Sequence, residues 1–162
     1  MKTPSRYAAI FVCVSIVGCA GTLQPSRQDP ANYNRLEAAV ESCDLEKTRS
    51  LVAASPQLVS SQGWGKLTPL HLAAQNRCPD AAAFLIRNGA QIDARADGGT
   101  TPLHLAAQKG SIDVASVLLA AGASINATDA RRRTPLDRAN AWGQPKMAAF
   151  LRQYGGKCVG TH

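Results

Sequence analysis

Thr68-Pro69-Leu70-His71-Leu72-Ala73-Ala74 is the stretch of this 162-residue sequence that decides the fold, because it recurs at a fixed interval. The same seven residue types return at residues 101–107, and a degraded copy, Thr-Pro-Leu-Asp-Arg-Ala, occupies residues 134–139. Successive copies begin 33 residues apart. A unit that stacks on its own copies must keep its length, so the equal spacing predicts a solenoid of repeated supersecondary units.

The register extends beyond the repeated phrase. Residues 74–94 align without a gap on residues 107–127, and each stretch contains an apolar run that closes with Gly-Ala. On these residues the chain resembles an ankyrin-repeat protein, whose 33-residue unit is a turn followed by two antiparallel helices. The resemblance implies an all-α ankyrin-repeat solenoid of about four helix-turn-helix units with short loop or hairpin connections.

The expected domain covers residues 34–156, in units of about 34–66, 67–99, 100–132 and 133–156, and leaves 157–162 as a tail. The first unit has lost the Thr-Pro-Leu-His opening and carries a polar face, as a terminal capping repeat should. Proline is tolerated in the first turn of a helix, so the three Thr-Pro pairs predict helix starts. Gly155-Gly156 suits the end of the last helix.

The two histidines of the phrase, His71 and His104, raise the alternative of a metal or catalytic site. The resemblance implies a structural role instead, in which each imidazole bonds threonine and backbone groups of adjacent units. Asp137 takes the equivalent position in the last unit. No cysteine or carboxylate lies at zinc-ligand spacing from either histidine, so we expect neither a metal nor a cofactor.

The N-terminus carries a second signal. Lys2 and Arg6 precede an apolar run over residues 7–17, which is too short to span a bilayer but suits a signal peptide. Ile16-Val17-Gly18-Cys19 closes the run and resembles a bacterial lipoprotein box, which implies that Cys19 is lipidated and becomes the mature N-terminus. An ordinary cleaved signal and a signal anchor are the alternatives.

The lipoprotein interpretation divides the N-terminal part into a signal peptide, residues 1–18, and a lipidated cysteine with a flexible tether, residues 19–33. Stable acylation would hold the folded domain beside a membrane. Ala20 follows the cysteine, where an aspartate commonly retains Gram-negative lipoproteins in the inner membrane. For a Gram-negative source, the resemblance therefore favours the outer membrane, facing the periplasm.

Three cysteines remain after Cys13 leaves with the signal and Cys19 takes lipid: Cys43, Cys78 and Cys158. An odd number leaves at least one thiol free or paired between molecules. Cys43 and Cys78 fall in the helix-joining turns of neighbouring units, so a disulfide between them requires those turns to lean together.

The charge of the chain is basic, with 18 Lys and Arg against 11 Asp and Glu and a net charge of +7. The run Arg131-Arg132-Arg133 precedes the last Thr-Pro-Leu. It fits a solvated loop, a contact to anionic lipid or phosphate, or a contact to an acidic protein. One triplet without an extended basic face argues against nucleic-acid binding.

Ankyrin proteins bind partners through loop tips and the exposed surface of the first helix of each unit. The matching positions in this chain are Trp64, Leu67, Gln75, Asn76, Asp97, Thr100, Gln108, Lys109, Arg131, Arg133, Ala141 and Trp142. Interface hot spots are enriched in Trp and Arg, so a groove from Trp64 to Trp142 flanked by arginine is the candidate site. Alternatively, Trp64 packs under its own loop and Trp142 covers the open end of the stack.

No catalytic motif remains once the repeat positions are explained, and an open solenoid surface does not enclose a reaction, so we expect no enzyme. The sequence favours a monomeric, membrane-anchored scaffold in a bacterial envelope that binds a protein. One alternative is an inhibitor or immunity-type protein that neutralises a periplasmic toxin or hydrolase. A secreted effector is the other, if Cys19 is not lipidated.

Overall fold

A computed structural model describes residues 30–159 of the chain. Within this range it contains eight α-helices, three short 3-10 helices and no strand, which confirms the all-α prediction. The expected signal peptide, Cys19 and the tether up to residue 29 lie outside the described residues. No helix between residues 30 and 159 is both long enough and apolar enough to cross a bilayer.

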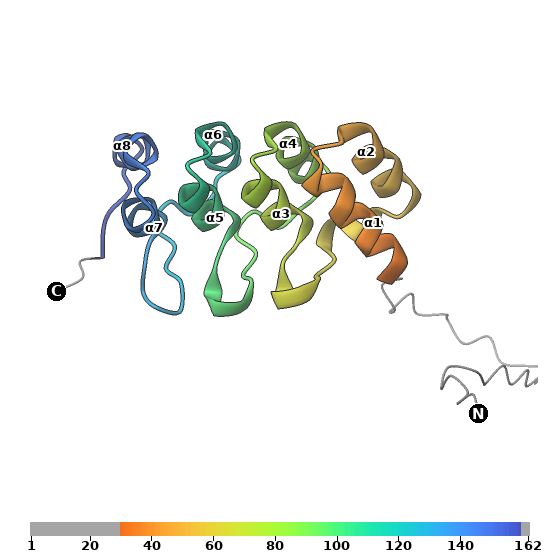
Figure 1. Cartoon of the computed structure of the whole chain (residues 1–162), viewed down its shortest axis with the longest axis horizontal. Helices are drawn as coiled ribbons and strands as arrows, with labels where there is room; N and C mark the ends of the chain where they lie inside the picture. The colour runs from red at the N-terminus through yellow and green to blue at the C-terminus, as the bar shows by residue number, and fades with distance from the viewer. Residues whose placement is uncertain (1–29, 160–162) are drawn as a thin grey trace, which may run out of the picture.

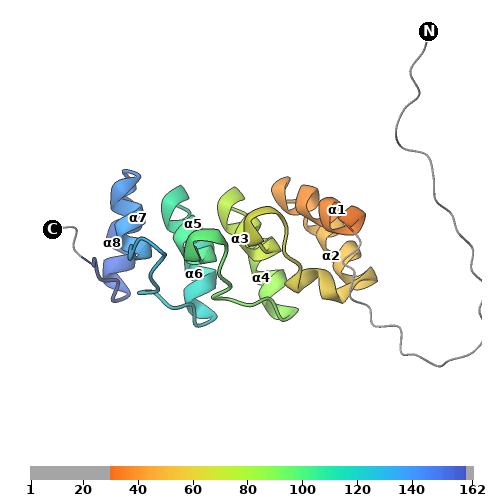
Figure 2. The ribbon, with the colours of Figure 1, turned by 90° about the horizontal axis from the view of Figure 1, so that it is seen from below.

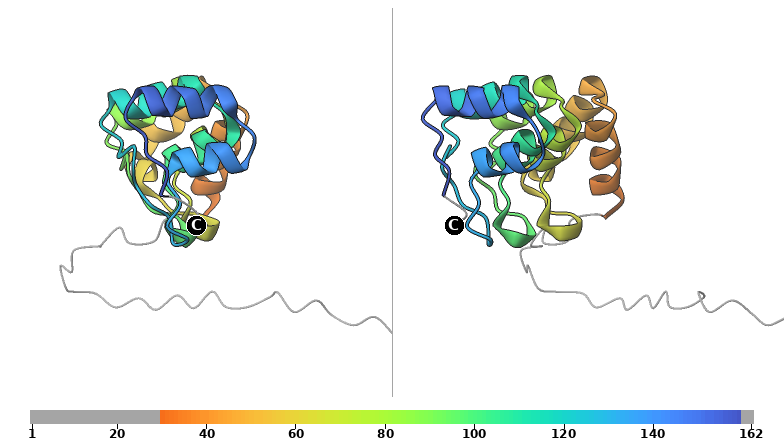
Figure 3. Two further views of the ribbon diagram at one scale, coloured as in Figure 1. Left: turned by 90° about the vertical axis from the view of Figure 1, so that its left-hand side faces the viewer. Right: turned by 60° about the vertical axis from the view of Figure 1, so that its left-hand side comes forward.

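The helices form two layers that run along the stack (Figure 1). The first helix of each unit lies in one layer and the second helix in the other. The loops between units project from the first layer, away from the second (Figures 1 and 3). The first layer holds α1 (Pro30–Glu41), α3 (Pro69–Asn76), α5 (Pro102–Lys109) and α7 (Pro135–Ala141), and the second holds α2 (Leu45–Ala54), α4 (Pro79–Arg87), α6 (Ile112–Ala120) and α8 (Pro145–Gln153). From below, the units follow one another in chain order (Figure 2).

The helices α3, α5 and α7 begin where the Thr-Pro pairs predicted. Each threonine is the N-cap, with an extended backbone, and each proline is the first helical residue. In α7 the Asp137 carboxylate accepts the backbone N–H of Thr134 at 2.9 Å, and the Thr134 hydroxyl accepts the N–H of Asp137 at 3.2 Å. This reciprocal cap satisfies donors that the first helical turn leaves without partners.

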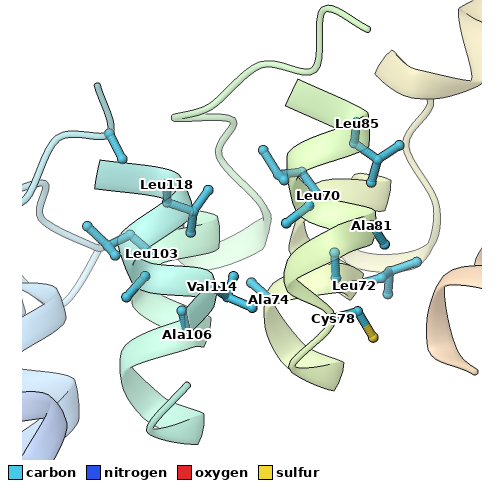
Figure 4. Packing of buried hydrophobic residues seen from close by; sticks show 14 of the residues in the cluster. Leu70, Leu72, Ala74, Cys78, Ala81, Leu85, Leu103, Ala106, Val114 and Leu118 are labelled. Atoms are coloured by element: carbon cyan, nitrogen blue, oxygen red, sulfur yellow. The ribbon is translucent and has the colours of Figure 1, made fainter. Parts of the chain in front are cut away.

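The core runs along the interior of the stack as a ladder of equivalent leucines. Leu70 and Leu103 come from the first helices and Leu85 and Leu118 from the second helices, and none of the four is exposed to solvent (Figure 4). Alanines of the first helices, such as Ala107, are also fully buried and let neighbouring units approach closely. Burial of each large side chain stabilises the fold by about 1.5–3 kcal/mol.

The first helix begins at Pro30, inside the stretch that the sequence assigned to the tether. Tyr33 explains the difference, because its side chain is buried and its hydroxyl donates a hydrogen bond to the carbonyl of Leu67 at 3.2 Å. Burial and the nearby charge of Glu37 raise the pKa of Tyr33 to about 12. The tyrosine therefore fastens an extra turn of α1 to the loop of the next unit.

The last unit has a polar outer side. Asn140 and Arg152 occupy the positions that Ala107 and Leu119 hold one unit earlier, and both are exposed. The Arg152 guanidinium donates to the Asn140 side-chain oxygen at 3.4 Å. These replacements match the requirement that a terminal repeat present a polar face to water.

A disulfide joins Cys43 to Cys78, and their Cα atoms lie 5.4 Å apart. Cys43 lies in the turn between α1 and α2 with a left-handed backbone, φ 54°. Cys78 is the N-cap of α4. The two turns therefore lean together, as a bridge between the first two units requires. Among the described residues Cys158 is a free, exposed cysteine.

Candidate protein-binding surface

Two of the loop tips are tight turns that depend on glycine, whereas Arg132 takes the left-handed position, φ 59°, in the tip before α7. Gly65 and Gly98 lie within the short helical turns Trp64–Lys66 and Asp97–Gly99 and adopt φ values of 68° and 72°. Glycine enters this left-handed region without the steric cost that a side chain brings. These two tips therefore turn sharply, and Trp64 and Asp97, which precede the two glycines, are exposed to solvent.

Neighbouring tips are joined by hydrogen bonds. The backbone N–H of Ala130 donates to the carbonyl of Gly98 at 2.8 Å. Next to this bond, the Arg95 guanidinium donates to the carbonyl of Thr128 at 3.0 Å. These two tips lead into the third and fourth units and are called the third and fourth tips. They consequently form one connected surface.

The histidines hold successive units together. Nδ1 of His71 accepts the backbone N–H of Thr68 at 3.2 Å, so the ring proton lies on Nε2, which donates to the carbonyl of Thr100 at 3.0 Å. His104 repeats this arrangement with Thr101 and with the carbonyl of Arg133, at 3.2 and 2.9 Å. Burial lowers the pKa of both imidazoles, which keeps them neutral.

These bonds leave neither histidine free to bind a ligand. In the range from residue 30 to residue 159 no group of three or more His, Cys, Asp or Glu side chains is placed to hold a metal ion. Both imidazoles therefore have a structural role between successive units.

An ion-pair network lies beneath the arginine triplet. The Asp129 side chain is 1% exposed, and its Oδ2 lies 3.0 Å from guanidinium nitrogens of both Arg133 and Arg138. The backbone N–H groups of Arg131 and Arg133 each donate to Oδ1 at 2.9 Å. Burial alone would raise the pKa of Asp129, but the Arg133 N–H and the two guanidinium groups lower it to about 2.

Arg138 extends the network to the third unit. One guanidinium nitrogen donates to the side-chain oxygen of Gln108 at 2.8 Å, and the other donates to the hydroxyl of Thr100 at 2.9 Å. A depression of about 290 Å³ opens above this network, between the third and fourth tips. Its lining combines Asp97, Gly98, Thr100, Asp129, Ala130, Arg131, Arg133 and Arg138.

A family model for ankyrin repeats in three copies matches residues 36–129 and again residues 99–161. The chain belongs to the ankyrin-repeat family. A stretch of 36 residues, or 22% of the chain, is 56% identical to the zebrafish (Danio rerio) protein fem-1 homolog A. The match spans only 6% of that relative, so it assigns no particular activity to this chain. Ankyrin repeats are protein-interaction modules, and their family is generally non-catalytic.

The structure distributes the predicted contact residues of this ankyrin-repeat surface over three environments. Six of the predicted residues are exposed: Trp64, Gln75, Asp97, Arg131, Ala141 and Trp142. The partly buried residues are Leu67, Asn76, Gln108, Lys109 and Arg133.

Thr100 does not belong to the accessible surface. It is 8% exposed, and its hydroxyl and carbonyl are engaged by Arg138 and His71. Leu67 packs against the core, and Arg133 is paired with the buried Asp129. The burial of Thr100 corrects the prediction that this side chain faces a partner. Leu67 and Arg133 remain partly exposed, while they contact the core and Asp129 respectively.

The two tryptophans occupy separate positions on the ankyrin surface. Trp64 is 93% exposed at a loop tip, so it does not pack under its own loop. Trp142 is 57% exposed at the C-terminus of α7. Neither lines the depression between the third and fourth tips. The exposed tryptophan at the tip and the arginine-rich depression are therefore two distinct features of the surface.

Sequence reasoning missed Arg138 and Asp129. A signal was present, because Arg138 aligns with Leu105 and Asp129 with Ala96 of the preceding unit. Both positions change from apolar to charged on either side of the last Thr-Pro pair, and the two charges have opposite sign. Such a pair of changes indicates a buried ion pair, since a buried charge needs a partner.

Proposed function

We propose that this ankyrin-repeat protein is a non-catalytic adaptor, anchored by lipid in a bacterial cell envelope, that holds an envelope or periplasmic protein on its loop tips and first helices. The observation that carries the proposal is the exposure of Trp64, 93% at the tip of a structured loop. A tryptophan in water gains nothing for folding, whereas interface hot spots are enriched in this residue.

The lipid anchor is supported by the sequence of residues 1–19. Cys19 precedes the first helix by only a short segment, since α1 begins at Pro30. Lipidation at Cys19 would therefore keep the solenoid close to the membrane, with its N-terminal unit nearest the anchor. We place it in the outer membrane, facing the periplasm, if the source is Gram-negative.

An inhibitor or immunity-type role is the second candidate. The hydrogen-bonded third and fourth tips favour the inhibitor role, because a preorganised surface binds with a smaller loss of conformational entropy. A complex that abolishes an enzymatic activity of the partner would select the inhibitor, and a complex that leaves the activity intact would select the adaptor. The secreted-effector alternative requires that Cys19 is not lipidated.

The proposal is tested by comparing wild-type protein with Cys19→Ala in fractionated cells, with Cys13→Ala as the matched control. We expect wild type and the control in the outer-membrane fraction, and Cys19→Ala in the soluble periplasmic or unprocessed fraction. Trp64→Ala should keep the wild-type location and lose the captured partner. Wild-type protein in the medium would instead support the effector.

A further inference from the structure

The positive charge of the chain is concentrated at one end of the solenoid. Residues 30–99 hold seven basic and seven acidic side chains, whereas residues 100–159 hold eight basic and three acidic side chains. The net charge of +5 over the described residues therefore comes from the third and fourth units. An asymmetry of this kind creates a local field that attracts negatively charged partners.

The depression above Asp129 lies within this basic half. Two guanidinium groups, those of Arg133 and Arg138, share the single carboxylate of Asp129. The floor of the depression therefore keeps one uncompensated positive charge. Arg138 is only 12% exposed on its side chain and Arg133 29%, which limits screening by water. Arg131 adds an exposed positive charge to the lining and Asp97 an exposed negative one, so three arginines face two aspartates and the lining carries one net positive charge.

The guanidinium groups are fixed before any ligand arrives. Arg138 is held by Gln108, Thr100 and Asp129, and the Arg133 side chain is held by Asp129. Four of the five N–H donors of Arg138 are already used by these partners. A second carboxylate would therefore be bound mainly by Arg133 and Arg131, because guanidinium N–H donors match the two carboxylate oxygens. Preorganised donors bind with less entropic loss than mobile surface lysines.

We infer that this depression receives a carboxylate side chain from an acidic segment of the partner protein, with Arg131 and Arg132 contacting the acidic residues beside it. The inference rests on the proposed function, because it gives the chemistry of the partner bound there. The volume of about 290 Å³ admits side chains but no folded element.

Other occupants fit the geometry less well. A second copy of the chain would bring another basic end against this one, and like charges repel. A nucleic acid would require aromatic side chains on which bases stack, and neither exposed tryptophan lines the depression. A flat lipid surface would meet Arg131 and Arg132 but not the guanidinium groups below them.

The inference is tested by fluorescence anisotropy with a fluorescein-labelled octaglutamate peptide and purified protein that carries Cys19→Ala. The test variant is Arg131→Glu with Arg132→Glu, since both side chains are exposed. The matched control is Arg35→Glu with Arg87→Glu, two exposed arginines of the neutral half that give the same change in net charge.

We expect the test variant to weaken octaglutamate binding by at least about tenfold, the control to change it by less than about twofold, and octaglutamine not to bind. Equal weakening by both variants, or no binding by wild type, would overturn the inference. Tighter binding of oligothymidylate or of phosphatidylglycerol vesicles, lost in the test variant, would assign the depression to phosphate groups and would also overturn it. Because the test uses neither cells nor the native partner, such a failure leaves the fractionation test of the proposed function unaffected.

Discussion

Reduction of the Cys43–Cys78 disulfide should loosen the first repeat unit before the rest of the solenoid. The bond spans a sequence separation of 35 residues. A cross-link that closes a loop of this length removes unfolded-state entropy equivalent to about 4 kcal/mol at 25 °C. Because each repeat contacts only its neighbours, the loss falls on the interface of α1 and α2 with α3 and α4.

The assay is urea denaturation followed by far-UV circular dichroism, with and without a phosphine reductant, in a Cys158→Ser background. We expect reduction to lower the midpoint and to broaden the transition, because the first unit then unfolds at lower urea. Cys43→Ala with Cys78→Ala is the matched control, whose midpoint should not respond to reductant. An unchanged midpoint after complete reduction, verified by thiol titration, would refute the reasoning.

Four further outcomes follow from the same contacts. Leu103→Ala should cost about 2–5 kcal/mol in urea denaturation, because the side chain is fully buried in a central unit; an unchanged midpoint would contradict its place in the core. Burial lowers the folded-state pKa of His71 and His104, so the unfolded chain binds more protons and stability should fall as the pH drops below about 6.5; a midpoint constant from pH 7.5 to 5.5 would argue against neutral buried rings. Asp129→Ala should cost about 3 kcal/mol, because it leaves two arginines without their carboxylate, and a loss confined to the surface range of about 0.5 kcal/mol would show that the network contributes little. Trp64→Ala should change stability by less than about 0.5 kcal/mol while it weakens partner capture, and a large loss of stability would assign Trp64 a structural role.

The sequence predicted the parts of the fold that repeat. The 33-residue spacing defined the units, and Thr-Pro pairs such as Thr101-Pro102 defined helix starts, because capping is a local interaction between residues close in sequence. The structural role of the histidines was implied by the resemblance to ankyrin repeats. The beginning of α1 was not predicted, since it depends on the contact of Tyr33 with Leu67, which lies in the next unit.

The candidate site was predictable only in outline. Exposure at the loop tips followed from the repeat pattern, and Trp64 fits that expectation. The environment of Thr100 did not follow, because it depends on Arg138, a residue 38 positions away that replaces the usual leucine. Where one unit departs from the repeat, its changed side chains contact residues of the neighbouring unit. The repeated sequence pattern alone does not predict these contacts.

Site-specific photocrosslinking in living cells tests the central claim most directly, that the loop tips and first helices bind a protein partner. A benzophenone amino acid would replace Gln75, Asp97 or Arg131 on this surface, and Asp113 or Ser116 on the exposed side of α6 as controls. The account predicts the same discrete adduct from the three surface positions and none from α6. Adducts from α6 with none from the tips would contradict it.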